Sequence, residues 1–243
     1  MKSFEGFSPK ALTFFRQLAK NNSREWFAPR KEEYQQLVYR PMIEAVSAVN
    51  DGLRKFAVHY VTEPKKAIYR LYRDTRFSKD KTPYKSHLGA TFHHRKFGKN
   101  NAAGLYFSIS DKEVEVAGGM YMPGPEEWLA VRSAIARDVG SFEKIIHAKA
   151  LRRLFGVPHG RQLTRVPKHF DADAPGTDYL RYTQFYFYTM LDPKVATTPT
   201  LVKEVVARFR VLLPLTEYLN NAALAARATE QTDERPLRPS PMF

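Results

Sequence analysis

Basic side chains are concentrated between Lys65 and Lys99, where eleven Lys or Arg residues face only two acidic ones. Within this stretch, the segment from Tyr69 to Lys85, called the basic box below, interleaves cations with hydroxyl groups. Guanidinium groups bind phosphate or carboxylate oxygens through paired hydrogen bonds, and hydroxyls add neutral donors. We therefore predict an anion-binding site in the basic box. Its candidate ligand-binding residues are Arg70, Tyr72, Arg73, Arg76, Lys79, Lys81, Tyr84 and Lys85.

The alternative is that the basic box is a solvated loop whose two carboxylates, Asp74 and Asp80, pair with the neighbouring cations. The same two carboxylates are the candidates for a catalytic role or for Mg²⁺ binding. The surrounding Arg and Lys residues should lower the pKa of both carboxyls, which suits a ligand or a salt bridge better than a general acid. Because ion-pair networks also perturb carboxylates, a structural role is favoured for both.

Aromatic residues provide a second set of candidates. Tyr121 follows the pair Gly118-Gly119 and is assigned to the lining of a cleft. Residues 184–191 predict a strand, and alternation on a strand separates Phe185 and Phe187 from Tyr186 and Tyr188. We place the two phenylalanines in the core and the two tyrosines in a pocket wall. The alternative is a stacking platform for nucleic-acid bases.

Several chemistries lack the residues that they require. The absence of cysteine excludes disulfide scaffolds, Cys-based zinc sites and thiol nucleophiles. The seven histidines form neither H-x-x-x-H nor H-E-x-x-H, and no G-x-S-x-G motif is present. We expect no metal site and no cofactor.

The net charge of the chain is +14, which favours an anionic partner. Three classes of function fit this charge. The favoured class is the binding of a phosphate-bearing or other anionic small ligand at the basic box. The second is an enzyme of phosphoryl or phosphate-ester chemistry at the same site, using Asp74 or Asp80. The third is a nucleic-acid binder, which would need its charge spread out rather than focused.

Helices are predicted at 9–20, after Asn22, near 125–139, at 142–155 and after Pro199. Ser8 should cap the first helix and Asn22 the second, with Glu25 in capping-box position. Strands are predicted at 67–72, 88–94, 105–110, 113–116 and 184–191.

The predicted strands cluster between helices rather than alternating with them, which indicates an α+β fold with a mostly antiparallel sheet flanked by helices. We predict a single domain over residues 1–228, followed by a flexible, polar, Pro-rich tail at 229–243. The N-terminus lacks the apolar region of a secretory signal, and no stretch is apolar enough to span a membrane, so we expect a cytoplasmic protein.

Four segments of the sequence resemble one known family. They are the run from Arg73 to Lys85, residues 21–27 (NNSREWF), residues 118–123 (GGMYMP) and residues 165–168 (RVPK). Together they are similar to DUF2461, an uncharacterised family found widely in bacteria, over roughly Phe4 to Leu213. The resemblance implies a soluble, single-domain protein. It implies no catalytic residues, because none is established for the family.

Overall fold

The structure is a computed structural model, and it describes residues 4–76, 78–97 and 102–233, with side chains as far as residue 225. Its strands form one antiparallel meander in which each strand pairs with the next along the chain. The strands are β1 (His87–His93), β2 (Gly104–Ser110), β3 (Val114–Met120) and β4 (Phe185–Leu191).

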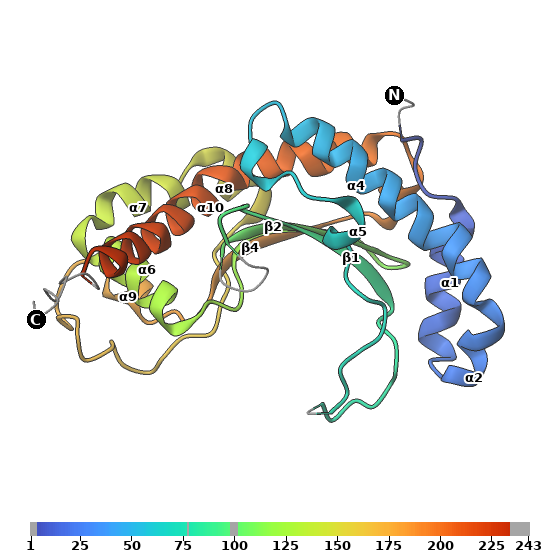
Figure 1. Ribbon diagram of the computed structural model, residues 1–243, viewed down its shortest axis with the longest axis horizontal. Coiled ribbons are helices and arrows are strands. Elements are labelled where there is room, and N and C mark those ends of the chain that lie inside the picture. The colour runs from blue at the N-terminus through green and yellow to red at the C-terminus, as the bar shows by residue number, and fades with distance from the viewer. Residues whose placement is uncertain (1–3, 77, 98–101, 234–243) are drawn as a thin grey trace, which may run out of the picture.

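Helices cover one face of this sheet and both of its ends. Figure 1 shows α4 and α10 above the sheet, α1 and α2 at one end, and α6, α7 and α9 at the other. This arrangement confirms the predicted α+β fold. The helices are α1 (Pro9–Lys20), α2 (Arg24–Phe27), α3 (Lys31–Tyr34), α4 (Arg40–Leu53), α5 (Pro64–Ala67), α6 (Pro125–Arg137), α7 (Val139–Ile146), α8 (Lys149–Phe155), α9 (Thr177–Leu180) and α10 (Thr200–Asp233), with 3-10 or π turns at Ala28–Arg30, Gln35–Tyr39, Val58–Tyr60 and Pro193–Thr197.

The core lies between the sheet and α10. Strand alternation directs Phe92 of β1 and Phe107 of β2 to the helical side, where both are fully buried. The ring of Phe92 packs edge-on against Phe209 of α10, with 5.4 Å between ring centroids. One face of the sheet therefore packs against the helices, and the alternate residues of the same strands point to the opposite face.

Two predictions of local structure were wrong. The predicted strand at 67–72 forms only isolated bridges, Ile68 with Ala90 and Tyr72 with Tyr84, because α5 takes up its first residue and its later residues pair with two different segments. The N-cap of α2 is Ser23, whose hydroxyl accepts a hydrogen bond from the Trp26 amide.

Asn22 has a different role, which links two distant parts of the chain. Its side-chain Nδ2 donates to the Tyr84 carbonyl at 2.9 Å, and its Oδ1 accepts from the Tyr84 amide at 3.0 Å. An asparagine side chain can satisfy both backbone groups of one residue, which a cap would not do. The basic box is therefore held to the helical flank at Tyr84.

The predicted tail falls partly within α10. This helix continues past Thr229 to Asp233, and residues 234–243 lie outside the described part of the chain. The flexible tail and the domain boundary at residue 228 stay predictions.

Candidate functional site

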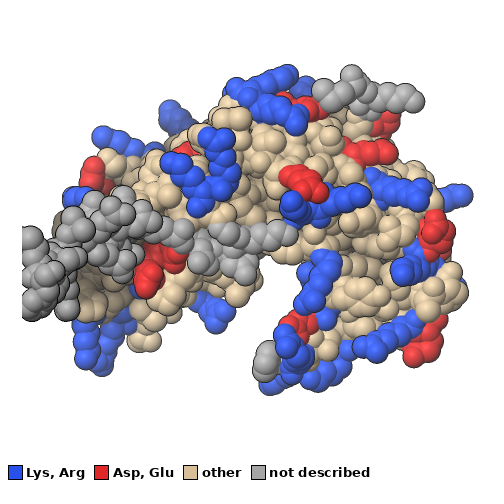
Figure 2. Space-filling view, in the orientation of Figure 1, with Lys and Arg blue, Asp and Glu red and all other residues tan. Residues whose placement is uncertain are grey.

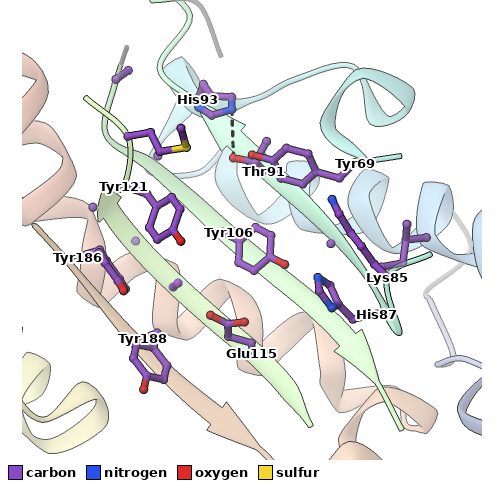
Figure 3. A pocket seen from close by; sticks show the side chains of 18 of the residues that line it. Tyr69, Lys85, His87, Thr91, His93, Tyr106, Glu115, Tyr121, Tyr186 and Tyr188 are labelled. Atoms are coloured by element: carbon purple, nitrogen blue, oxygen red, sulfur yellow. Dashed lines mark hydrogen bonds between the residues drawn. The ribbon is translucent and has the colours of Figure 1, made fainter. Parts of the chain in front are cut away.

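The face of the sheet opposite α10 contains a pocket of about 630 Å³, called the sheet pocket below. Its lining comes from alternate residues of all four described strands, together with the segments that precede β1 and follow β3. Figure 3 shows side chains from each of these elements pointing into one space. Pockets of this volume are typical for small organic ligands.

Small residues form the floor of the sheet pocket and tyrosines form its sides. Gly89 of β1 lies under the ring of Tyr106, since a Cβ atom at Gly89 would lie only 2.4 Å from the Tyr106 hydroxyl. Gly119 of β3 has φ +135°, and a Cβ there would meet the Phe185 carbonyl at 2.4 Å. Gly89 therefore leaves room for the Tyr106 ring, and Gly119 allows β3 to lie close to the backbone of β4.

Cationic groups gather at the end of the sheet pocket next to β1. Arg70, Lys85 and His87 all line this end, and the Lys85 amine lies 5.2 Å from the centre of the Tyr69 ring. Burial lowers the pKa of Lys85, and the nearby charges of Arg70 and Arg73 lower it further. Burial also lowers the pKa of His87, with contributions from Lys85 and Arg73. The described residues contain no salt bridge to Arg70 or Lys85.

One carboxyl group faces the same space from β3. Glu115 lies two strands away from β1, which is roughly 10 Å between backbones. Burial raises the pKa of Glu115, and the charge of Glu113 adds to the effect. Figure 3 shows the Tyr106 side chain on the strand between Glu115 and Lys85. Acidic and basic groups thus occupy opposite sides of the sheet pocket.

Aromatic rings form the wall along β4. Tyr121 packs edge-on against Tyr186, with 5.2 Å between ring centroids, and Tyr188 lies 4.5 Å from the His159 ring. Tyr186 and Tyr188 line the sheet pocket, whereas Phe185 and Phe187 are fully buried on the other side of the strand. The division of these four residues between core and pocket wall agrees with the alternation in the sequence.

The comparison with known families decides the membership of this chain. The model of a conserved hypothetical protein family, DUF2461, matches residues 10–218, which include every residue that lines the sheet pocket. The chain belongs to the DUF2461 family. A search of curated proteins found no match to it. Among its described helices, none has both the length and the apolar character that a membrane span requires. The cytoplasmic location stays a prediction.

In this DUF2461 protein the basic box divides into two parts. Its two ends, which contain Arg70 and Lys85, line the sheet pocket. Tyr121, the candidate outside the basic box, lines the same pocket. The intervening described residues, 71–76 and 78–84, are called the projecting loop below, and they lie below the sheet in Figure 1. In Figure 2 the Lys and Arg side chains of this loop border a hollow in the molecule, with acidic side chains among them.

The cations of the projecting loop are paired within the loop. Arg73 forms a salt bridge with Asp80, and its Nη1 donates to the Thr82 hydroxyl at 2.9 Å. Arg76 binds Asp74 through two bonds, Nε to Oδ1 at 3.0 Å and Nη2 to Oδ2 at 2.8 Å. This bonding lowers the pKa of Asp74 to about 2. It matches the alternative in which Asp74 and Asp80 serve as structural partners of the arginines.

The other candidates in the projecting loop lie apart from the sheet pocket. The Lys81 amine donates to the Thr75 carbonyl at 2.9 Å, and Lys79 is exposed. Tyr84 is 3% exposed and stacks on Phe27 with 4.4 Å between ring centroids, whereas Tyr72 is 50% exposed and lines a smaller pocket of about 300 Å³. The predicted ligand-binding set is therefore not brought together in one concavity.

Sequence reasoning missed His87, Tyr106 and Glu115 in the sheet pocket. Tyr106 and Glu115 belong to a hairpin whose alternation was visible, with Leu105, Phe107 and Ile109 as the apolar positions. The polar face of that hairpin was the available signal, since its residues must face away from the core. Among the described residues, no group of three or more His, Asp and Glu side chains could hold a metal ion.

Proposed function

We propose that this DUF2461 protein binds a small organic anion in the sheet pocket. The anionic group lies at Arg70 and Lys85, and the apolar or planar part of the ligand lies along Tyr121, Tyr186 and Tyr188. The observation that carries this proposal is the pair of cations at one end of the pocket, neither of which forms a salt bridge among the described residues. The charge of Arg70 acts on Asp74 only from beyond salt-bridge distance. Of the two, Lys85 is partly buried and Arg70 is exposed. A partly desolvated cation such as Lys85 interacts with an anion more strongly than an exposed one does.

The small-ligand proposal is favoured over nucleic-acid binding by the location of the charges. A single strand is bound by a charged groove that follows its backbone for several nucleotides. Here the cations without a salt bridge lie at one end of a single pocket, and the projecting loop neutralises two of its arginines internally. Focused charge of this kind suits a single anionic group.

An enzyme acting on the same anion is the second candidate function. The specific observation is that burial favours the uncharged forms of both basic and acidic groups in one pocket. It lowers the pKa of Lys85 and of His87, and it raises the pKa of Glu115. Such opposed shifts are characteristic of acid and base groups in active sites. Asp74 and Asp80 are poorly suited to proton transfer, because their bonds to arginine and threonine keep both ionised.

Thermal unfolding with and without added anions tests the binding proposal. Phosphate, AMP, pyruvate and phenylpyruvate each present an anionic group, and a ligand at a hundred times its dissociation constant stabilises a protein by about 2.7 kcal/mol. At least one of them should raise the melting temperature of the wild type. The Arg70→Gln variant should lose this response.

The matched control is Arg76→Gln, which removes an arginine of the same basic box whose side chain is 76% exposed and paired with Asp74. This variant should keep the full response. If none of the four anions stabilises the wild type, the proposal is wrong. If Arg76→Gln loses the response while Arg70→Gln keeps it, the anion binds at the projecting loop instead.

A further inference from the structure

Lys85 differs from the other lysines of the basic box in what surrounds its amine. Lys81 donates to a backbone carbonyl, and Lys79 is exposed to solvent. Lys85 is partly buried, with its amine near the face of Tyr69 and no salt bridge among the described residues. Partial desolvation and nearby cations make a lysine amine easier to deprotonate, while the face of the Tyr69 ring attracts its charged form. The neutral amine is a nucleophile.

The groups that face Lys85 come from several elements. Arg70 and Arg73 approach from the segment before the projecting loop and from the loop itself, and both disfavour a charged amine. His87, the first residue of β1, and Tyr106 of β2 face the same space. Glu115, the carboxyl group of the sheet pocket, is on the far side of Tyr106. The amine therefore has cations and neutral hydroxyl or imidazole groups nearby, with the carboxylate more distant.

We propose that Lys85 is a nucleophile that forms an imine with the carbonyl group of a small organic anion of the 2-oxo acid class. This inference rests on the proposed function, because Arg70 must hold the carboxylate of the same molecule. A 2-oxo acid carries its carbonyl carbon directly beside the carboxylate. Binding of the carboxylate at Arg70 thus brings the carbonyl to the neighbouring amine, both groups lining the same end of the pocket.

The chemical step needs no partner besides the ligand and the side chains present. The neutral Lys85 nitrogen attacks the carbonyl carbon, and the carbonyl oxygen takes up a proton. The nitrogen then loses a proton, and the new hydroxyl group takes up a second proton. The carbon–oxygen bond breaks, water leaves, and a carbon–nitrogen double bond forms as a protonated imine. His87 is suited to accept and return these protons, since burial and the charge of Arg73 favour its neutral form.

Reductive trapping tests the inference directly. The wild-type protein is incubated with pyruvate and sodium cyanoborohydride near neutral pH, and the modified lysines are located by peptide mass spectrometry. Lys85 should be modified about tenfold faster than Lys112, an exposed lysine on the turn between β2 and β3. The rate at Lys85 should also level off at a lower pH than the rate at Lys112.

Two variants assign the modification. Lys85→Arg keeps a positive charge but has no amine that can form a stable reduced adduct, so it should show only the slow background at other lysines. Lys112→Arg should react as the wild type does. Circular dichroism of both variants establishes that they are folded.

The outcomes separate this inference from the binding proposal. If pyruvate stabilises the wild type through Arg70 but Lys85 is modified no faster than Lys112, the imine is overturned and the binding proposal stands. If no anion stabilises the protein and no selective adduct forms, both are overturned. Selective modification of a lysine outside the sheet pocket would also contradict the role of Lys85.

Discussion

In the projecting loop, Arg73 and Arg76 each bind a carboxylate only a few residues away, whereas in the sheet pocket Arg70 and Lys85 have no carboxylate partner among the described residues. The two regions are adjacent in sequence and similar in composition. They differ in geometry, because the loop folds its own acids and arginines together, while Arg70 and Lys85 lie at the sheet pocket, beyond salt-bridge distance of any described carboxylate. The arginines of the loop are therefore neutralised within it, and the two cations of the pocket are not.

The ion pairs of the loop and the unpaired groups of the sheet pocket also differ in their effect on folding. Exposed ion pairs of the loop type contribute little to folding, since water screens them and ordering two long side chains costs entropy. Partly buried, unpaired groups oppose folding, because burial disfavours their charged forms. Such groups are retained where a ligand supplies the missing partner, which is the reason for expecting function in the sheet pocket.

The largest effect is expected from Asn22→Ala, which removes the attachment of the basic box to the helical flank, at the point where the projecting loop meets Lys85. The Tyr84 amide and carbonyl would lose both hydrogen bonds, and leaving buried polar groups unpaired costs about 1–3 kcal/mol. Urea denaturation should show this loss. The anion response of the sheet pocket should weaken as well, because Lys85 directly follows Tyr84.

Asn21→Ala is the matched control for Asn22→Ala. Asn21 is exposed, and its side chain donates only to the Gln17 carbonyl within its own helix end. Its removal should have a clearly smaller effect on stability and none on the anion response. Equal effects of the two substitutions would show that the attachment at Tyr84 neither stabilises the protein nor positions Lys85.

An intermediate effect on stability is expected when the pH is lowered. The contribution of the sheet pocket should be lost at a higher pH than the contribution of the loop. The pKa of His87 is lowered from its usual value of 6.5, so the stability that depends on neutral His87 is complete above that pH and is lost as the pH falls through the folded-state pKa. The pKa of Asp74 is lowered from 3.8 to about 2, so its contribution persists above 3.8 and is lost only towards pH 2.

Denaturation curves measured from neutral pH down to about pH 5 test this order. Stability should fall over this range, and His87→Gln should make the fall shallower. His94, whose pKa is also lowered chiefly by burial, accounts for a remaining part of the slope. His147→Gln, at an exposed histidine, should leave the slope unchanged. A His87→Gln slope identical to that of the wild type would contradict the assignment.

The smallest effect is expected from Arg76→Ala. Its partner Asp74 is exposed on a loop, so the loss of this ion pair should leave the melting temperature within experimental error of the wild type. Differential scanning calorimetry in low and high salt measures this difference in melting temperature. A large drop in melting temperature would mean that the projecting loop is a structural framework, which would remove the contrast between the two regions.

Much of the fold could be predicted from the sequence because it depends on contacts between near neighbours. The Ser8–Pro9 start of α1, the hairpin of β2 and β3 and the strand β4 follow from capping, alternation and turn signals that act over a few residues. The alternation in β4 also separated Tyr186 and Tyr188 from Phe185 and Phe187. The family resemblance, based on runs of adjacent residues, was confirmed over residues 10–218.

The composition of the site was decided by tertiary structure. Tyr106 and Glu115 share one face of the sheet because the strand register places their alternate positions there, and because α10 covers the other face. Arg70 and Lys85, which precede β1, line the same pocket because backbone hydrogen bonds join Tyr69 to Gly89 and Lys85 to Leu71. The sequence alone determined that each strand has two unlike faces. It did not determine which cations of the basic box would pair inside a loop and which would stay free, because that depends on backbone positions set by contacts such as Asn22 with Tyr84, residues far apart in the chain.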